Sequence, residues 1–158
     1  MAEVVAYIAM GSNLGNRAAT LGRAVEMLGR SPGVSVGSVS RLVETDPVGG
    51  PPGQGKYLNG AVAIRTTLSS PELLRRLKEI EKSLGRDRSV EPRWGPRTCD
   101  LDILLVGEAV LRTGELTIPH PQMHLRRFVL GPLAEIAPQA VHPVLGETIA
   151  QLLADLRD

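Results

Sequence analysis

Residues 99–106 read CDLDILLV, an apolar run that opens with two acids two residues apart. The apolar run predicts a strand, inside which aspartate is unusual. Because alternate side chains of a strand point to the same face, Asp100 and Asp102 are expected to share one face, roughly 6.5 Å apart along the chain. The opposite face is expected to pack on the core through Leu101, Ile103 and Leu105.

The segments around this strand alternate between strand and helix patterns. β-Rich runs predict strands at residues 4–10, 34–43 (bulged at 37–38) and 57–67, and a short extended segment at 109–118. Apolar spacing and helix-starting residues predict helices at 17–28, 70–84, 119–136 (in two pieces broken near 128–132) and 147–156. Since several strands follow one another directly, the pattern favours an α+β fold with a mixed, largely antiparallel sheet, and a ferredoxin-like arrangement fits.

The length and charge of the chain limit its class. A length of 158 residues corresponds to one ordinary domain, so residues 1–158 are expected to form a single unit. Lys and Arg number 18 against 17 Asp and Glu, a balance that does not favour binding to nucleic acid or to a membrane surface. No stretch approaches the length of a membrane span, and the only cysteine, Cys99, cannot form an internal disulfide. We expect a cytoplasmic globular protein, and a monomer.

The paired acids predict a cation site. Two carboxylates that share a strand face repel each other unless a cation lies between them. Hard oxygen ligands at this spacing suit magnesium held together with the phosphates of a substrate, and two such ions can lie about 4 Å apart in phosphoryl-transfer sites. For Asp100 and Asp102 taken alone, a solvated strand face with two surface acids is an equally good interpretation.

A basic loop leads directly into the paired acids and changes that balance. Its arginines are Arg86, Arg88, Arg93 and Arg97. Guanidinium groups match phosphate oxygens in fixed forks, so this loop favours a metal–polyphosphate site over a solvated surface. Trp94 lies in the same charged loop, where it is poorly placed for the core. The chain has no Gly-x-x-x-x-Gly-Lys-Ser/Thr P-loop, so a kinase built on it would use magnesium and arginines instead.

A histidine and two aromatic residues are further candidates. His120 and His124 are four residues apart and would suit zinc on a helix, but the chain has no cysteine cluster. Contact of His120 and Arg126 with phosphate is therefore the better functional interpretation. Tyr57 and Phe128 lie beside loops, where their flat faces could stack on a ring, although a core position remains the better interpretation for each residue taken singly.

Five stretches together resemble one enzyme family across almost the whole chain. They are residues 7–17 (YIAMGSNLGNR), 57–59 (YLN), 81–86 (EKSLGR), 93–102 (RWGPRTCDLD) and 119–133 (PHPQMHLRRFVLGPL). With them the chain resembles the 6-hydroxymethyl-7,8-dihydropterin pyrophosphokinases, and the run RWGPRT-x-DLD is highly specific for that family. The resemblance implies a three-layer α/β/α domain with a ferredoxin-like core.

The resemblance also implies the reaction and the roles of residues. Pyrophosphate moves from the co-substrate ATP to the pterin hydroxymethyl group, AMP is released, and two magnesium ions assist. The implied metal ligands are Asp100 and Asp102, and the implied catalytic set adds Arg86 and Arg97. The implied contacts to ATP are Glu81, Arg86, Trp94, Arg97, His120 and Arg126. The implied pterin pocket contains Thr45, Val48, Tyr57, Asn59, Trp94 and Phe128, with Tyr57 and Phe128 stacking on the ring.

Two departures from the family pattern and two alternative functions are also considered. Pro121 stands where some members have tyrosine, and Ser89 where some have a basic residue, which bears on nucleotide affinity and not on the reaction. A non-catalytic ferredoxin-like domain that senses a small molecule would need neither the aspartates nor a metal. An RNA-binding module would need aromatic residues on adjacent strands and a basic sheet face. One Phe, two Tyr and a net charge of +1 argue against that module.

Overall fold

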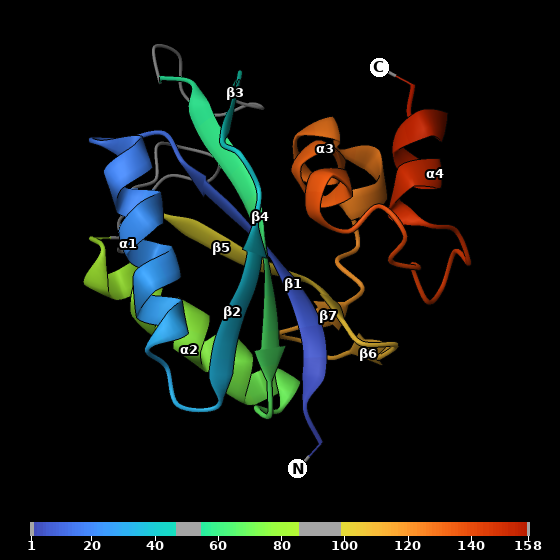
Figure 1. Cartoon of the computed structure of the whole chain (residues 1–158), viewed down its shortest axis with the longest axis horizontal. Helices are drawn as coiled ribbons and strands as arrows, with labels where there is room; N and C mark the ends of the chain where they lie inside the picture. The colour runs from blue at the N-terminus through green and yellow to red at the C-terminus, as the bar shows by residue number, and fades with distance from the viewer. Residues whose placement is uncertain (1, 47–54, 86–98, 158) are drawn as a thin grey trace.

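The computed structural model of the chain describes residues 2–46, 55–85 and 99–157. Its main sheet has the strand order β2-β4-β1-β5, and β3 also pairs with β4 (Figure 1). The strands are β1 (Val4–Ser12), β2 (Val34–Val39), β3 (Val43–Thr45), β4 (Tyr57–Thr66) and β5 (Asp100–Val106). These strands pair in antiparallel fashion. The α+β class is confirmed, and the expectation of a mixed sheet is corrected for the described strands.

Helices cover both faces of the sheet. They are α1 (Arg17–Gly29), α2 (Ser70–Ser83), the 3-10 helix η1 (Met123–Leu125), α3 (Arg127–Ile136) and α4 (Ile149–Asp155). Figure 1 shows α1 and α2 on one side of the sheet and α3 and α4 on the other. A small hairpin of β6 (Leu111–Arg112) and β7 (Thr117–Ile118) forms a separate sheet. Within the described ranges, none of the helices has the length and apolarity needed to cross a membrane.

Capping residues in the sequence set the starts of the first two helices. The Asn16 side chain accepts a hydrogen bond from the backbone N–H of Ala19 at 3.2 Å and caps α1. Ser69 and Glu72 form a reciprocal capping box at the start of α2, with proline in its first turn. Because these signals are local, the starts predicted for both helices are confirmed.

Apolar side chains form two clusters, one on each face of the sheet. The first joins α1 and α2 to the sheet, and its helical members include Leu21, Ala24, Leu28, Leu73, Leu77 and Ile80. The second joins α3 and α4 to the other face, and its helical members include Val129, Leu130, Leu133, Ile149 and Leu152. Burial of such side chains is the main favourable term in folding. A polar group on the sheet is therefore accessible only where the helices leave it uncovered.

Strand β5 departs from simple alternation. Its register with β1 shifts by one residue at Leu104, which is a β-bulge. Leu101 and Ile103 belong to the first cluster, as expected, but Leu105 belongs to the second. The extra residue reverses the alternation of side chains beyond it, so the expectation for Leu105 is wrong.

Two predicted segments are divided differently in the structure. Residues 34–43 contain β2 and the first residue of β3, with a break in the pairing between them. The register of β2 with β4 shifts between Val36 and Val39, which confirms the predicted bulge. The helix break expected near 128–132 lies instead at Arg126, whose backbone is extended (φ −121°, ψ 109°). Helix α3 continues through the buried Pro132, because packing of α3 on the sheet outweighs the loss of one backbone hydrogen bond.

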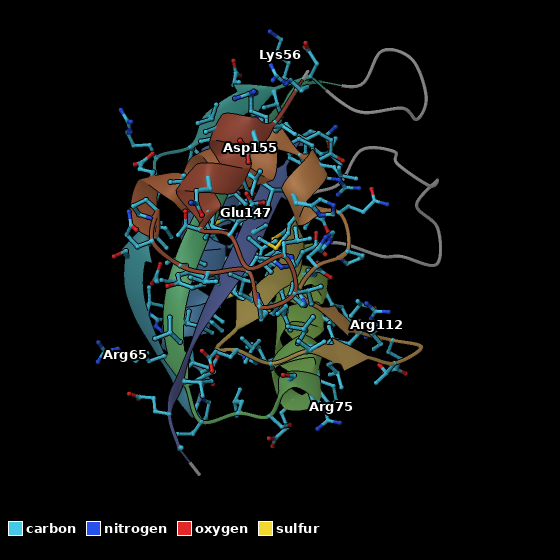
Figure 2. The ribbon with its side chains drawn as sticks, turned by 90° about the vertical axis from the view of Figure 1, so that its right-hand side faces the viewer. Lys56, Arg65, Arg75, Arg112, Glu147 and Asp155 are labelled. Carbon is cyan, nitrogen blue, oxygen red and sulfur yellow. The ribbon has the colours of Figure 1, made fainter. Side chains whose placement is uncertain are left out.

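Charged side chains are spread over the surface. Figure 2 labels the cations Lys56, Arg65, Arg75 and Arg112, of which Lys56 and Arg65 lie far from each other and from the other two. In this view they do not form one basic face, in agreement with the formal net charge of +1.

Candidate active site

A cavity of about 620 Å³ lies where β1 ends and β5 begins. Its volume is in the range of small-molecule sites. The wall formed by the sheet contains residues of β1, β3, β4 and β5, and residues 120–129 form the facing wall. The cavity therefore lies on the face of the sheet that α3 covers.

Strand β5 presents Asp100 and Asp102 to this cavity, as their spacing predicts. Both acids are half-buried, whereas Leu101 between them is 5% exposed and belongs to the core cluster on the opposite face. The residues that pair with the two acids on β1 are Gly11 and Ala9. Such small cross-strand neighbours leave the space above the acids open to a ligand.

The donor set at this position fits magnesium. Magnesium usually binds one or two protein carboxylates, while substrate phosphates and waters complete its shell. Within residues 2–46, 55–85 and 99–157, no group of three or more His, Cys, Asp or Glu side chains is arranged to hold a metal ion. Asp100 and Asp102 therefore fit a cation that arrives together with a polyphosphate.

The zinc alternative required two histidines on one helix. In the structure η1 contains only residues 123–125, so His120 lies outside it. The ring of His124 instead stands edge-on to that of His142, with ring centroids 6.3 Å apart. The local geometry on which the zinc alternative depended is therefore not present at these residues.

His120 lines the cavity as a neutral hydrogen-bond donor. Its backbone N–H donates to the Leu104 carbonyl at 3.0 Å, which attaches this segment to β5. Its Nδ1 accepts a hydrogen bond from the backbone N–H of Gln122 at 3.1 Å, so the ring proton lies on Nε2. Burial, assisted by the Arg126 cation and partly opposed by Asp100, lowers the pKa of His120 to about 4. Near pH 7 the ring therefore offers an N–H group and no positive charge.

Arg126 brings a positive charge to the same wall. Its Nη2 donates to Gln122 Oε1 at 3.3 Å, and its Cζ lies 5.6 Å from the centroid of the Phe128 ring, within the range of a cation–π contact. Arg127 also lines the cavity, and its Nη2 donates to the Leu156 carbonyl at 3.4 Å. The guanidinium of Arg126 is thus oriented by two contacts near the protein surface.

Four residues of the predicted pterin pocket line this cavity as well: Thr45, Tyr57, Asn59 and Phe128. Asn59 is 6% exposed, and its side-chain amide donates to the Thr45 hydroxyl. A Cβ atom at Gly11 would lie 3.1 Å from Asn59 Oδ1 and 3.6 Å from Tyr57 Cδ1. The glycine therefore gives these two side chains the room they occupy.

The predicted site also includes five other residues, of which only Glu81 belongs to the described part of the chain. Val48, Arg86, Trp94 and Arg97 lie outside the described residues. Glu81 is 2% exposed, and its Oε2 accepts a hydrogen bond from the backbone N–H of Leu101 at 2.7 Å. The contact of Glu81 with ATP stays a prediction.

The cavity also contains residues that sequence reasoning missed: Asp46, Gln122, Leu125 and Arg127. The last three lie in the stretch 119–133, which carries part of the family resemblance. Neither charge nor spacing distinguishes Gln122 or Leu125 from an ordinary surface residue. Only Arg127, the neighbour of a predicted phosphate contact, had a local signal.

Comparison with protein families matches residues 7–138 to the family described as 7,8-dihydro-6-hydroxymethylpterin-pyrophosphokinase. The chain belongs to this pyrophosphokinase family. A Bacillus subtilis relative named 2-amino-4-hydroxy-6-hydroxymethyldihydropteridine pyrophosphokinase is 51% identical over 135 residues, 85% of this chain and 79% of the relative. A Pseudomonas aeruginosa relative of the same name is 43% identical over 148 residues, 94% of this chain and 89% of the relative. The reaction of the family is pyrophosphate transfer from ATP to hydroxymethyldihydropterin in folate biosynthesis.

Solved structures agree with this pyrophosphokinase assignment at the level of the fold. A Plasmodium falciparum HPPK-DHPS chain solved with pteroate matches 97% of this chain with a TM-score of 0.76 and 15% identity. An HPPK-DHPS chain in complex with substrates matches 97% with a TM-score of 0.73 and 14% identity. This chain covers 42% and 43% of those two proteins. At such identities the likeness shows the fold alone.

Proposed function

We propose that this pyrophosphokinase carries out its transfer in the cavity between β5 and residues 120–129. The observation that supports this site is that Asp100 and Asp102 face the same cavity as His120 and Arg126. Carboxylates suited to magnesium and donors suited to phosphate thus surround one space large enough for a ligand. The triphosphate of ATP would lie between them.

Each wall of the cavity has its own task in this proposal. Asp100 and Asp102 would hold two magnesium ions, whose chemistry is to neutralise the triphosphate and polarise the phosphorus under attack. His120 would donate its Nε2 proton in a hydrogen bond to a phosphate oxygen, and Arg126 would bring a full positive charge. The resemblance adds Arg86 and Arg97 as further phosphate contacts, and Glu81 and Trp94 on the ATP side.

The transfer itself is a substitution at the β-phosphorus of ATP. The pterin hydroxyl oxygen forms a bond to that phosphorus, and the bond to the oxygen that bridges the α- and β-phosphates breaks. AMP leaves with the bridging oxygen. Asp102 is the candidate acceptor of the hydroxyl proton. Positioning and charge neutralisation dominate such reactions, so little covalent work falls on the protein.

The pterin would occupy the part of the cavity next to β3 and β4. Tyr57 and Phe128 would stack on its ring. Asn59 is oriented by its hydrogen bond to Thr45 and would read the polar edge of the ring. The resemblance adds Val48 and Trp94 to this pocket.

We also propose the finer features of the architecture and assembly. The succession β1-α1-β2-β4-α2-β5 with the order β2-β4-β1-β5 supports a ferredoxin-like core, to which α3 and α4 add a third layer. Residues 1–158 would form one domain that acts as a monomer in the cytoplasm. Sedimentation of the protein with and without ATP would test the monomer.

The test of the function is an assay of AMP formation from ATP, magnesium and 6-hydroxymethyl-7,8-dihydropterin. Asp102→Asn should lower turnover by at least about 100-fold and leave pterin affinity nearly unchanged. Asp155→Asn makes the same change at an exposed position in α4 and should leave turnover as in the wild type. Near-normal turnover in Asp102→Asn would refute the metal role. If the wild type bound pterin without forming AMP, the chain would be a sensor domain instead.

A further inference from the structure

Glu81 is a buried acid on the face of α2 that packs against the sheet. It follows Leu77 by four residues, so helix geometry points it in the same direction as that core residue. Glu81 is 2% exposed and Leu77 is 0% exposed. A buried carboxylate is costly unless it accepts hydrogen bonds. The fold must therefore provide donors for Glu81 inside the first core cluster.

One donor comes from the strand that carries the paired acids. Strand β5 stands at the end of the order β2-β4-β1-β5, so one of its edges has no neighbouring strand in the described sheet. Such an edge leaves backbone N–H groups without a ladder partner. At Leu101 this N–H donates to Glu81 Oε2 at 2.7 Å, a length typical of a hydrogen bond to a charged group. The helix side chain thus takes the place of a strand carbonyl.

The position of this hydrogen bond matters because Leu101 lies between Asp100 and Asp102. The Leu101 side chain points into the core, while both acids face the cavity on the other side. Any displacement of the Leu101 amide moves the backbone of both neighbours. Sites that bind metal ions need ligands held to within about 0.5 Å by supporting contacts. The Glu81 carboxylate supports the backbone of Leu101, the one residue that links the two acids.

We propose that Glu81 is a positioning residue, which sets the spacing of Asp100 and Asp102 through the backbone N–H of Leu101. This inference rests on the proposed function, because it assumes that the two acids hold the metal ions. The hydrogen bond, and not the negative charge of Glu81, is the property that matters. In this role Glu81 acts from behind the strand, through the backbone of Leu101.

The experiment compares three variants by titration with Mn²⁺, followed by electron paramagnetic resonance, in the presence of a non-hydrolysable ATP analogue. Glu81→Met fills the same space without an acceptor and should weaken Mn²⁺ binding about 10- to 100-fold, as loss of a supporting contact does. Glu81→Gln keeps an acceptor oxygen and should remain within about threefold of the wild type. Glu79→Met makes the same change at a side chain that is 67% exposed on the same helix, and should have no effect.

Turnover should follow Mn²⁺ affinity across the series, while pterin affinity stays unchanged. If Glu81→Gln loses as much affinity as Glu81→Met, the charge is what matters and the proposal is overturned. Wild-type affinity in Glu81→Met overturns it as well. If thermal unfolding shows that Glu81→Met does not fold, Glu81→Asp takes its place, because it keeps the charge and withdraws the acceptor by one methylene. Loss of affinity in Glu81→Asp supports the proposal, and wild-type affinity overturns it.

Asp102→Asn in the same titration separates this inference from the proposed function. If Asp102→Asn weakens Mn²⁺ binding and Glu81→Met does not, only the positioning role fails. If Asp102→Asn also binds Mn²⁺ as the wild type does, the metal site itself is wrong, and with it the premise of the inference.

Discussion

The two walls of the cavity are held in place by different kinds of contact. Asp100 and Asp102 lie on a strand that pairs with β1, and the amide between them donates to a buried carboxylate at 2.7 Å. On the facing wall, Arg126 is oriented by a 3.3 Å hydrogen bond to the exposed side chain of Gln122 and by the ring of Phe128. We call the part of β5 that carries Asp100 and Asp102 the acid wall, and we call residues 120–129 the cation wall.

This difference indicates which part of the site is preorganised. Ladder hydrogen bonds and buried charged contacts are costly to break, whereas exposed contacts between side chains contribute little. The acid wall should therefore have nearly its working geometry before any ligand binds. The cation wall should adjust to the nucleotide, and its individual contacts should be easier to replace.

The largest expected effect compares one residue from each wall. Asp100→Asn should lower turnover about 100-fold or more, because an amide cannot supply the charge that the proposed magnesium ions require. His120→Gln should lower it about 10-fold or less, because the neutral His120 is only an N–H donor and glutamine also has one. Steady-state kinetics of AMP formation at saturating magnesium would measure both. Equal losses in the two variants would contradict the division into two walls.

A smaller effect is expected at Gly11 and Asn59, which we call the floor of the cavity. Gly11→Ala places a Cβ atom 3.1 Å from Asn59 Oδ1, so Asn59 must move by a few tenths of an ångström. We expect pterin affinity to fall about 10-fold, as when one supporting contact is lost, and to fall more than affinity for an ATP analogue. Calorimetric titration with each ligand would measure this.

Gly22→Ala is the matched control for that change. Gly22 lies within α1, and a Cβ atom there would meet nothing within 4 Å. This variant should bind both ligands normally and gain up to about 1 kcal/mol of stability, because alanine is the better helix former. Normal pterin binding in Gly11→Ala would show that the floor of the cavity is as adaptable as the cation wall.

The acid wall is the part of the site that sequence analysis predicted best, since its signals are local. A spacing of two residues in a strand places Asp100 and Asp102 on one face, and the structure brings both into the cavity. The rule failed a few residues later, at Leu105, because the bulge at Leu104 depends on pairing with β1. Alternation predicts side-chain direction only while the register is regular.

The contact that supports the acid wall could not be predicted, because it joins residues distant in sequence. Glu81 and Leu101 are 20 positions apart, and although its spacing from Leu77 places Glu81 on the apolar side of α2, nothing local indicates which N–H group it accepts from. The same holds for the protonation of His120, whose lowered pKa arises mainly from burial. The family resemblance pointed to both residues as contacts of ATP but did not reveal what holds them.

The smallest expected effect concerns the segment behind the cation wall. The His142 side chain is buried, and its Nδ1 accepts hydrogen bonds from the backbone N–H groups of Val144 at 3.3 Å and Leu145 at 3.1 Å. Burial, together with the neighbouring His124, lowers the pKa of His142. Protonation of Nδ1 would remove the acceptor for both N–H groups, so the folded state resists it.

The sign of the pH dependence follows from that shift. Below about pH 6.5 an unfolded histidine binds a proton that the folded His142 does not yet bind. The free energy of unfolding should therefore be highest above that pH and fall as the pH drops below it, by at most about 1.4 kcal/mol per pH unit for one group. Urea unfolding at pH 7.5 and pH 5.5 would measure the fall in the wild type and in His142→Gln.

His142→Gln should show a smaller fall than the wild type, but not the absence of one. His120 has a pKa lowered to about 4 and contributes with the same sign, so part of the fall should remain. Hydrogen exchange would place the effect, because at pH 5.5 exchange corrected for its intrinsic pH dependence should rise first at the amides of Val144 and Leu145. The Leu101 amide, bonded to Glu81, should keep its protection. Equal rises at all three amides would mean that acid loosens the protein as a whole, and that the two walls differ less than their contacts suggest.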